Sequence, residues 1–408
     1  MSGQKLETNS IQQALAALGS GPLEEQALLS HIHPLFSKVL GRQETYLANH
    51  SLGRPLDQTD RDIQQAVHHW YADMGDAWDN WLAEIQHFRH HIAQLIHAPT
   101  ADGIIPKTSA GQGIRAVLNC FDTKINVLTT TDEFSSIDHI LKVYAQRDRI
   151  ALQYVKPDNQ GIYHEEDMAA SVKQADSLVV ISMVLFTTGQ YFTNLAQVIR
   201  EIQARGAMVL IDLYHAAGAL PVNIEMLGAD FAIGGCYKYL RGGPGACWLY
   251  IHPRHLTGSF TTLDTGWFAQ PSPFEFRRPE KAELAHGGNA FLESTPPVLP
   301  YYQAKAGLEF TLGLEVERVR AYSLKQQERL TDLLHERGIH VLGKPETRGA
   351  FLTIRHQSAD RIASRLKEGK IIIDAREDLL RICPDILTTD AELIKCVRQL
   401  AQALAQSP

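Results

Sequence analysis

The sequence has few cysteines and no apolar run long enough to cross a membrane. Only five of its 408 residues are cysteines, and no two of them form a C-x-x-C pair. We therefore expect neither a disulfide framework nor a zinc site, and most of the cysteines should be small buried side chains. A membrane-spanning helix needs about 20 consecutive, mostly apolar residues, so we expect no membrane partner.

An excess of charge of one sign is also missing. The formal net charge is −7, from 39 basic and 46 acidic residues that alternate along the chain. This pattern gives no basic stripe for nucleic acid, so we expect small-molecule partners. Met1 to Ser20 lack the basic region that opens a secretory signal, which predicts a cytoplasmic location.

Histidine, by contrast, is abundant, with 18 residues. Clustered histidines such as His68 and His69 fall within a stretch of helical periodicity from Ile63 to Leu95. Most lie on its polar side, which is typical of a solvated helix face. We therefore expect no metal site.

The chain is longer than the roughly 250 to 300 residues at which one hydrophobic core stops growing, which predicts two domains. Residues 1 to about 100 are expected to form helices and loops, including Leu23 to Leu40. Strand-like and helix-like segments then alternate, which predicts a mainly parallel sheet with helices on both faces. The strand-like runs are Ile125–Leu128, Ile150–Val155, Ser177–Ser182, Ala207–Ile211, Phe231–Ile233 and Cys247–Ile251, and the helix-like segments are Ser136–Ala145, Glu165–Lys173 and Asn194–Ala204.

A compact α+β domain is expected after Pro300. It begins with one long amphipathic stretch from Tyr301 to Arg337 and ends with a helix from Asp390. Between them we expect strands at Ile339–Leu342, Ala350–Ile354, Ile371–Ile373 and Leu380–Ile382, and a helix at Ala359–Glu368. We therefore divide the chain into an N-terminal segment (1–60) that joins the small domain and a dimer contact, a large cofactor domain (61–300) and a small domain (301–408).

The segment from Val209 to Ile251 contains the most informative residues. Asp212 ends an apolar run, and Lys238 follows 26 residues later, just before the glycine-rich run that starts at Gly242. Either residue alone is more typical of a turn or a solvated surface. Together they suit pyridoxal phosphate, which needs a lysine amine to bond to its aldehyde and a carboxylate to keep its ring nitrogen protonated.

The sequence of this segment resembles that of the kynureninases, which belong to the class V aminotransferase group of fold type I pyridoxal-phosphate enzymes. Their pattern D-L-A-H-A-x-G, followed by S-Y-K-Y-L, corresponds here to Asp212–Gly218 and Cys236–Leu240. Other family segments follow in order: Y-L-x-x-N-S-L-G at Tyr46–Gly53, an aromatic loop at Asp132–His139, T-G-Q at Thr188–Gln190, G-W-F at Gly266–Phe268, S-N-P-P at Ser294–Pro297 and R-V-A-P at Arg381–Pro384. The resemblance spans about residues 40 to 400. It implies a seven-stranded sheet with a smaller C-terminal domain, the cofactor pyridoxal 5′-phosphate, and a homodimer with the site at its interface.

The resemblance also implies roles for residues around the cofactor ring. Lys238 would hold the cofactor and move the substrate α-proton, and Asp212 would bind the ring nitrogen. Phe134 would stack on the ring, with Asp138 at its edge. His215 would pack on or hydrogen-bond the side of the ring that carries the 3-oxygen.

The phosphate is expected at the start of a helix, where free N–H groups and the helix dipole favour an anion. The segment Thr108–Gly113 has the small residues such a turn needs, and we assign the backbone of Ala110 and Gly111. By the resemblance, Ser182, Tyr237 and Trp267 also hydrogen-bond the phosphate, with Tyr237 a catalytic residue as well. Thr295 stands where an asparagine is usual. The segments of Trp267 and Thr295 would come from the second subunit.

An amino-acid substrate also needs its carboxylate held, for which the planar fork of arginine is suited. Arg381 matches the family's carboxylate-binding arginine, and Arg376 is the nearby alternative. Ser51 and Asp76 complete the expected substrate site. Asp76 stands where the family has a histidine that recognises the aryl ketone of the substrate.

The implied reaction is hydrolytic cleavage of the Cβ–Cγ bond of kynurenine or 3-hydroxykynurenine to alanine and an anthranilate. Because Asp76 and Thr295 depart from the kynureninase pattern, action on another amino acid is an alternative. Such an enzyme would be an aminotransferase, a β-lyase or a cysteine desulfurase. A desulfurase needs a mobile nucleophilic cysteine, whereas Cys383 lies in a strand-like run. A catalytically silent cofactor-binding scaffold is the alternative outside the enzymes.

Overall fold

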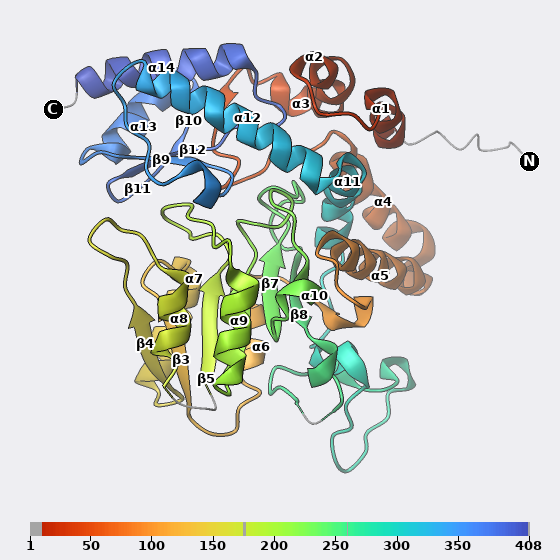
Figure 1. Cartoon of the computed structure of the whole chain (residues 1–408). Coiled ribbons are helices and arrows are strands. Elements are labelled where there is room, and N and C mark those ends of the chain that lie inside the picture. Colours follow the sequence, from red (N-terminus) through yellow and green to blue (C-terminus); the bar gives the residue numbers. More distant parts are fainter. Residues whose placement is uncertain (1–9, 174–176, 259, 407–408) are drawn as a thin grey trace, which may run out of the picture.

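A seven-stranded sheet forms the centre of the chain in the computed structural model, which describes residues 10–173, 177–258 and 260–406 (Figure 1). Its strand order is β2-β8-β7-β6-β5-β3-β4. The strands are β2 (Ile104–Lys107), β3 (Ile125–Thr130), β4 (Ile150–Val155), β5 (Ser177–Ser182), β6 (Met208–Asp212), β7 (Phe231–Gly235) and β8 (Cys247–Ile251). Strands β3 to β7 pair in parallel, and β8 runs antiparallel to both of its neighbours. The predicted mainly parallel seven-stranded sheet is confirmed.

Apolar residues cover both faces of this sheet, as its near-continuous hydrophobic strands require. In β5, Val179 and Ile181 belong to one core cluster, and Leu178 and Val180 belong to the other. The first cluster includes residues of α5 (Ala77–Leu95), α8 (Glu165–Ser171), α9 (Leu195–Ala204) and α10 (Ile224–Leu227). The second includes residues of α6 (Ala110–Leu118) and α7 (Ser135–Gln146). Helices therefore lie on both faces, as predicted.

The N-terminal helices are more broken than the sequence pattern predicts. The expected helix Leu23 to Leu40 consists of α2 (Glu25–Ala27), two short turns of non-α helix and α3 (Ser37–Leu40). The long stretch from Ile63 to Leu95 is two helices, α4 (Gln58–Asp73) and α5, because the chain turns at Met74 with a φ of 47°. The first helix is α1 (Ser10–Leu18), and β1 (Thr45–Tyr46) follows α3.

The C-terminal part lies above the sheet in Figure 1 and forms its own core around two small sheets. One sheet has the order β11-β12-β9, and the other pairs β1 with β10 in parallel. The elements are α11 (Leu299–Leu314), α12 (Val316–His335), β9 (Leu352–Arg355), α13 (Ala359–Glu368), β10 (Ile371–Ile372), β11 (Asp374–Arg376), β12 (Leu379–Ile382) and α14 (Asp390–Ala405). The pairing of β1 with β10 attaches the N-terminal segment to this part.

The predicted amphipathic stretch from Tyr301 to Arg337 forms two helices, because Glu315 has a φ of 68° and separates α11 from α12. One prediction for the C-terminal part was wrong. Ile339–Leu342 is not a strand, although the backbone N–H of Leu342 donates to the carbonyl of Thr353 at 2.9 Å. The proposed domain limits at residues 60 and 300 stay a prediction. Among the described residues, no helix is long and apolar enough to cross a membrane.

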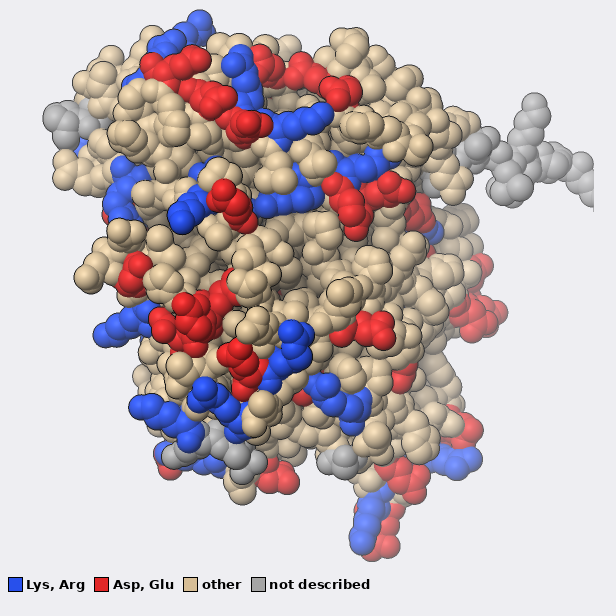
Figure 2. Space-filling view, in the orientation of Figure 1, with Lys and Arg blue, Asp and Glu red and all other residues tan. Residues whose placement is uncertain are grey.

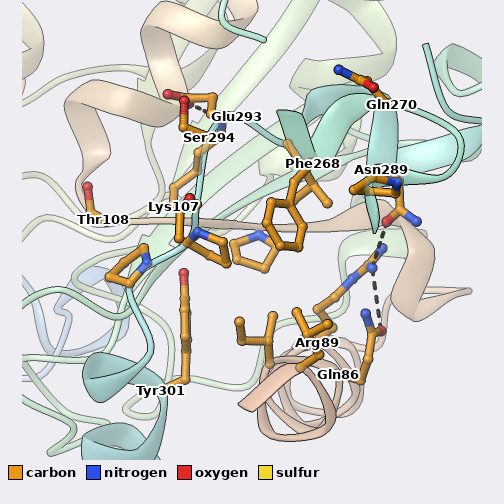
Figure 3. A pocket seen from close by; sticks show the side chains of 18 of the residues that line it. Gln86, Arg89, Lys107, Thr108, Phe268, Gln270, Asn289, Glu293, Ser294 and Tyr301 are labelled. Atoms are coloured by element: carbon orange, nitrogen blue, oxygen red, sulfur yellow. Dashed lines mark hydrogen bonds and ion pairs between the residues drawn. The ribbon is translucent and has the colours of Figure 1, made fainter. Parts of the chain in front are cut away.

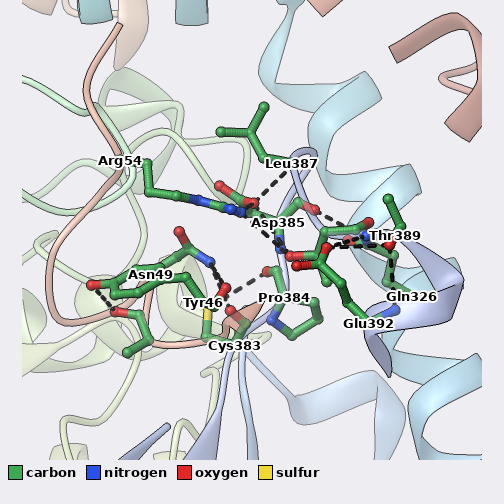
Figure 4. Close-up of polar contacts among 12 residues, drawn as sticks. Tyr46, Asn49, Arg54, Gln326, Cys383, Pro384, Asp385, Leu387, Thr389 and Glu392 are labelled. Carbon is green, nitrogen blue, oxygen red and sulfur yellow. Dashed lines mark hydrogen bonds and ion pairs between the residues drawn. The ribbon is translucent and has the colours of Figure 1, made fainter. Parts of the chain in front are cut away.

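A carboxylate that is only 11% exposed joins three parts of the chain near the sheet (Figure 4). Asp385 pairs with Arg54 of the N-terminal loop and accepts a 2.8 Å hydrogen bond from Arg241, which follows β7. Burial alone would raise the pKa of Asp385, but the two guanidinium groups lower it to about 2. Asn49 adds a 2.9 Å hydrogen bond to the carbonyl of Cys383. These contacts hold the loop of residues 46–54 against both β7 and the C-terminal sheet.

Candidate active site

Asp212 and Lys238 meet at the carboxyl end of the parallel strands, where α/β sheets bind their ligands. Asp212 is the last residue of β6, and Lys238 lies in the turn after β7, the next strand of the sheet. Each is 4% exposed. The amine of Lys238 lies 2.8 Å from Nε2 of His215, and the backbone N–H of Tyr214 donates to the carboxylate of Asp212 at 2.7 Å.

Burial shifts the pKa values of Lys238, Asp212 and His215. It lowers the pKa of Lys238, although attraction to Asp212 opposes the effect. It raises the pKa of Asp212, opposed by the hydrogen bond from Tyr214 and by Lys238. The pKa of His215 is held well below its usual value by burial and by the nearby Lys238. A lysine amine with a lowered pKa is available as a nucleophile near neutral pH.

Aromatic rings surround the lysine amine. Nζ of Lys238 lies 5.8 Å from the ring centroid of Phe134 and 5.6 Å from those of Tyr214 and Tyr237. Phe134 in turn packs against Phe186, with 5.4 Å between centroids. A flat aromatic ligand bonded to Lys238 would therefore meet the faces of several rings.

A second buried carboxyl group, absent from our sequence predictions, lies beside Asp212. Glu133 is 6% exposed and accepts hydrogen bonds from the backbone N–H and the hydroxyl of Ser182, at 2.8 and 2.7 Å. Ser182 is paired with Asp212 across β5 and β6. Burial, with repulsion from Asp212, raises the pKa of Glu133 to about 8. The hydroxyl of Ser182, which we expect to bind the phosphate, is thus directed to Glu133.

The predicted phosphate loop opens a helix, as expected. Ala110 and Gly111 are the first residues of α6, and the hydroxyl of Ser109 accepts from the backbone N–H of Gln112 at 3.1 Å. A Cβ atom on Gly111 would lie 2.9 Å from a methyl group of Ile140, so a larger residue would crowd α7. The first N–H groups of a helix lack partners within it and can bind an anion.

Arg381, the predicted carboxylate-binding residue, is 1% exposed and already bound within the chain. One arm donates to the carbonyl of Phe186 at 2.6 Å, and the other pairs with Asp374, its cross-strand neighbour on β11. Asp374 also accepts from Arg376 at 2.7 Å and from the hydroxyl of Ser51 at 2.9 Å. Two guanidinium groups share one carboxylate, so the cluster keeps a positive charge toward a substrate carboxylate.

Four other predicted residues make no described contact with Lys238 or Asp212. Asp138 accepts instead from Lys142 at 2.6 Å and from the hydroxyl of Tyr154 at 2.7 Å. Asp76 is exposed in the turn between α4 and α5. Trp267 packs against Phe268, Phe274 and Phe276, and Thr295 lines a separate cavity. Their roles stay predictions.

The cavity that includes Thr295 measures about 340 Å³ and lies beside the start of the phosphate loop (Figure 3). Thr108 and Gln112 line it together with the segment from Glu293 to Pro297. The buried amine of Lys107 pairs with Glu293 at 2.6 Å and donates to the carbonyl of Phe291 at 3.1 Å. Thr295 therefore lies near the phosphate loop of its own chain.

The sequence matches a family model described as Aminotransferase class-V, over residues 58–393. The chain belongs to the class V aminotransferase family. A kynureninase of Geobacillus thermodenitrificans is 26% identical over 404 residues, covering 94% of this chain and 93% of the relative. A kynureninase of Shouchella clausii is also 26% identical, covering 83% of each chain. The uncharacterized aminotransferase YcbU of Bacillus subtilis is 23% identical, covering 83% of this chain and 90% of the relative.

Solved structures share the fold of this family member. A mutant of C-DES with glycine covalently linked to its PLP cofactor superposes with a TM-score of 0.78 at 20% identity, covering 90% of this chain and 98% of that chain. The cysteine desulfurase CsdA of Escherichia coli gives a TM-score of 0.78 at 16% identity, covering 95% and 100%. The predicted fold type I architecture is confirmed.

The cofactor of this family member is pyridoxal 5′-phosphate, as predicted, and the residues present fit it. Lys238 offers a buried amine with a lowered pKa, and Asp212 offers a carboxylate on the adjacent strand. Nδ1 of His215 is buried and has no hydrogen-bond partner among the described residues, so a ligand can supply one. Phe134 and the first turn of α6 supply a ring face and an anion site.

Sequence reasoning missed Glu133, Asp374 and His50 as residues of this site. Glu133 directly precedes Phe134 in a segment already assigned to the cofactor, so its position was available from the motif. Asp374 could have been found as the neighbour of Arg381 across a short hairpin. His50 directly precedes Ser51 in the matched segment Tyr46–Gly53, so its position was also available from the motif.

Proposed function

We propose that this protein is a pyridoxal-phosphate enzyme that cleaves the Cβ–Cγ bond of kynurenine or 3-hydroxykynurenine by hydrolysis, giving alanine and an anthranilate. The observation that carries the proposal is the buried pair Lys238 and Asp212 at the carboxyl end of the sheet, with Arg381 near it. The chain is also related along most of its length to kynureninases. The activity would serve amino-acid metabolism, with tryptophan breakdown as the expected source of the substrate.

When bound, the cofactor supplies an electron sink for negative charge on the substrate carbons. Lys238 attaches it and then moves the α-proton, a task for which a lowered pKa suits the amine. Asp212 keeps the ring nitrogen protonated, and Tyr237 lies beside the amine as a further proton-handling group. Arg381 holds the substrate carboxylate, with Ser51 fixing the neighbouring Asp374.

Another class V reaction on a different amino acid is the second candidate. Asp76 and Thr295, which differ from the kynureninase pattern, favour it, because a site built for one polar group discriminates strongly against another. Cysteine desulfurase chemistry is the weakest form of this candidate. The thiol of Cys383 is fully buried, burial raises its pKa to about 12, and it donates to the carbonyl of Ala350 at 3.2 Å.

A homodimer is part of the proposal. In it, Trp267 and Thr295 of each chain would complete the phosphate site of the other, with Thr295 also lining a cavity beside Thr108 and Gln112 of its own chain. Large apolar side chains at the protein surface support a protein contact, among them Trp70, Tyr71 and Met74 near the turn after α4, which are 59%, 83% and 67% exposed. The charged residues on the face shown in Figure 2 alternate in sign, in keeping with a small-molecule enzyme.

The proposal is tested by product analysis. Purified protein saturated with pyridoxal phosphate is mixed separately with kynurenine, 3-hydroxykynurenine, cystine, cysteine and a set of common amino acids. Anthranilate or 3-hydroxyanthranilate together with alanine is the expected product. Pyruvate together with cysteine persulfide from cystine would establish the β-lyase candidate instead. Spectral binding of the cofactor without turnover of any amino acid would establish the silent scaffold.

A further inference from the structure

His50 lies in a loop that packs directly against the catalytic lysine. The backbone N–H of Gly53 donates to the carbonyl of Tyr237 at 2.8 Å. A Cβ atom on Gly53 would lie 1.9 Å from the carbonyl oxygen of Lys238, so only glycine allows this approach. The pairing of Arg54 with Asp385 fixes the end of the same loop. His50 is therefore held beside the site by its neighbours in sequence.

The imidazole of His50 is fully buried between groups of the site. It is 0% exposed and stacks on Phe351, with 4.6 Å between ring centroids. The ring of His215 lies 6.2 Å away, and Nε2 of His50 lies 3.3 Å from the carboxylate of Asp374. Burial lowers the pKa of His50 to about 3, which outweighs the attraction of Asp374. The side chain is therefore neutral at physiological pH.

Several polar atoms around Phe351 lack partners. Within the described residues, both ring nitrogens of His50, Nδ1 of His215 and Nε of Arg381 make no hydrogen bond, although Nε2 of His50 lies 3.3 Å from the carboxylate of Asp374. The side chains of His215 and Arg381 lie 5.5 and 5.6 Å from the ring of Phe351, on which His50 stacks. A buried polar atom without a partner costs about 1 to 3 kcal/mol, so such atoms are rare and need an explanation. This group of atoms beside Lys238 indicates a place where a ligand supplies the partners.

The neighbours of His50 indicate which ring nitrogen carries the proton. Asp374 is a carboxylate whose pKa is lowered: burial alone would raise it, but His50 and Arg381 outweigh burial. A carboxylate accepts hydrogen bonds, so the proton of the neutral imidazole belongs on Nε2, which faces Asp374. Nδ1 then carries a lone pair and can only accept. The free position of His50 is suited to an N–H or O–H donor.

We propose that His50 determines substrate specificity by accepting a hydrogen bond from an N–H or O–H group in the side chain of the bound amino acid, next to the carboxylate held by Arg381. Asp374 is the positioning residue that orients both His50 and Arg381. This inference rests on the proposed function, and it names the substrate class of the same site: amino acids with an N–H or O–H donor in the side chain. The ring amine of kynurenine is one donor of the required kind.

The test uses amino-acid pairs that differ by one donor: kynurenine with β-benzoylalanine, which lacks the ring amine, and serine with alanine. Dissociation constants are measured on the cofactor-loaded protein from the change in cofactor absorbance, and kcat/KM is measured where turnover occurs. His50→Phe keeps a ring on Phe351 but removes the acceptor. We expect it to weaken the donor-bearing member of the preferred pair about tenfold or more and to leave the other member unchanged.

A rescue variant, a control and a replacement for a variant that fails to fold complete the design. His50→Asn places a carbonyl oxygen near the position of Nδ1, and we expect it to restore most of the lost affinity. His68→Phe, at an exposed histidine, serves as the matched control. If His50→Phe fails to fold, His50→Leu replaces it. Equally weakened binding of both members of a pair, or no preference for the donor-bearing member in the unaltered protein, would overturn the inference about His50 but not the proposed function. Failure of the unaltered protein to bind any amino acid would instead overturn the proposed function.

Discussion

Replacement of Glu133 by glutamine tests whether the site contains a neutral carboxyl group beside an ionised one. Two carboxyl groups placed close together cannot both ionise without a large cost. Burial and repulsion from Asp212 raise the pKa of Glu133 from 4.5 to about 8, so Glu133 is the group that stays protonated. Glutamine has the shape of the protonated acid. It can still accept from the backbone N–H of Ser182 and can donate to the hydroxyl.

The magnitude follows from the linkage between protonation and stability. The pKa of Glu133 is higher in the folded than in the unfolded chain. The contribution of Glu133 to the free energy of unfolding is therefore complete below pH 4.5 and is lost as the pH rises to about 8. Each pH unit in this window changes the free energy of unfolding by about 1.4 kcal/mol per proton. From pH 5 to pH 8 the unaltered protein should therefore lose about 3 kcal/mol relative to Glu133→Gln.

The assay is urea unfolding of the unaltered protein and Glu133→Gln, at pH 5 and pH 8, with the same excess of cofactor. Comparison of the two proteins at each pH cancels the titration of all groups that do not interact with Glu133. Glu368→Gln, at an exposed position near the end of α13, is the control and should follow the unaltered protein at both values. A stability difference that does not change between pH 5 and pH 8 would show that Glu133 is ionised in the folded protein and that the reasoning is wrong.

Two further predictions concern the cofactor-binding pair. Lys238→Ala should fold but fail to attach the cofactor covalently, and borohydride reduction of the unaltered protein followed by peptide mapping should locate the label on Lys238. A label on another lysine would contradict the assignment. Asp212→Asn should retain the cofactor, measured by absorbance, while kcat falls on the order of a hundredfold or more, because an amide cannot keep the ring nitrogen protonated. Activity within a few-fold of the unaltered protein would remove Asp212 from this role.

The central sheet was predictable because its strands are buried on both faces. Each apolar run predicted between residues 125 and 251 is a strand in the structure. The short strand β2 was missed, because four residues that include Pro106 give little strand signal, and proline is tolerated at the edge of a sheet where β2 lies. The breaks at Met74 and Glu315 were missed because a positive φ at a residue other than glycine has no signal in the local sequence.

The residues expected to bind the cofactor were easier to predict from the sequence than those expected to contact the substrate, which we call the substrate end of the site. Asp212 ends one strand and Lys238 follows the neighbouring strand, and parallel strands bring their carboxyl ends together whatever the rest of the chain does. His50 and Asp374, by contrast, are far apart in the sequence and meet through the packing of the N-terminal loop on the C-terminal sheet. The motif at Tyr46–Gly53 includes His50, but no periodicity or motif shows that His50 meets Asp374.

This difference explains how specificity can vary within one fold. The ends of β6 and β7 belong to the main core, so a change there would disturb the sheet as well as the cofactor. The substrate end draws single side chains from separate segments: His50 from a loop, Phe351 from the start of the C-terminal sheet, and Arg381 with Asp374 from a hairpin. One substitution in such a segment alters a hydrogen bond to the substrate and leaves the sheet intact. We therefore expect differences in substrate among related enzymes to concentrate in these segments rather than around Lys238.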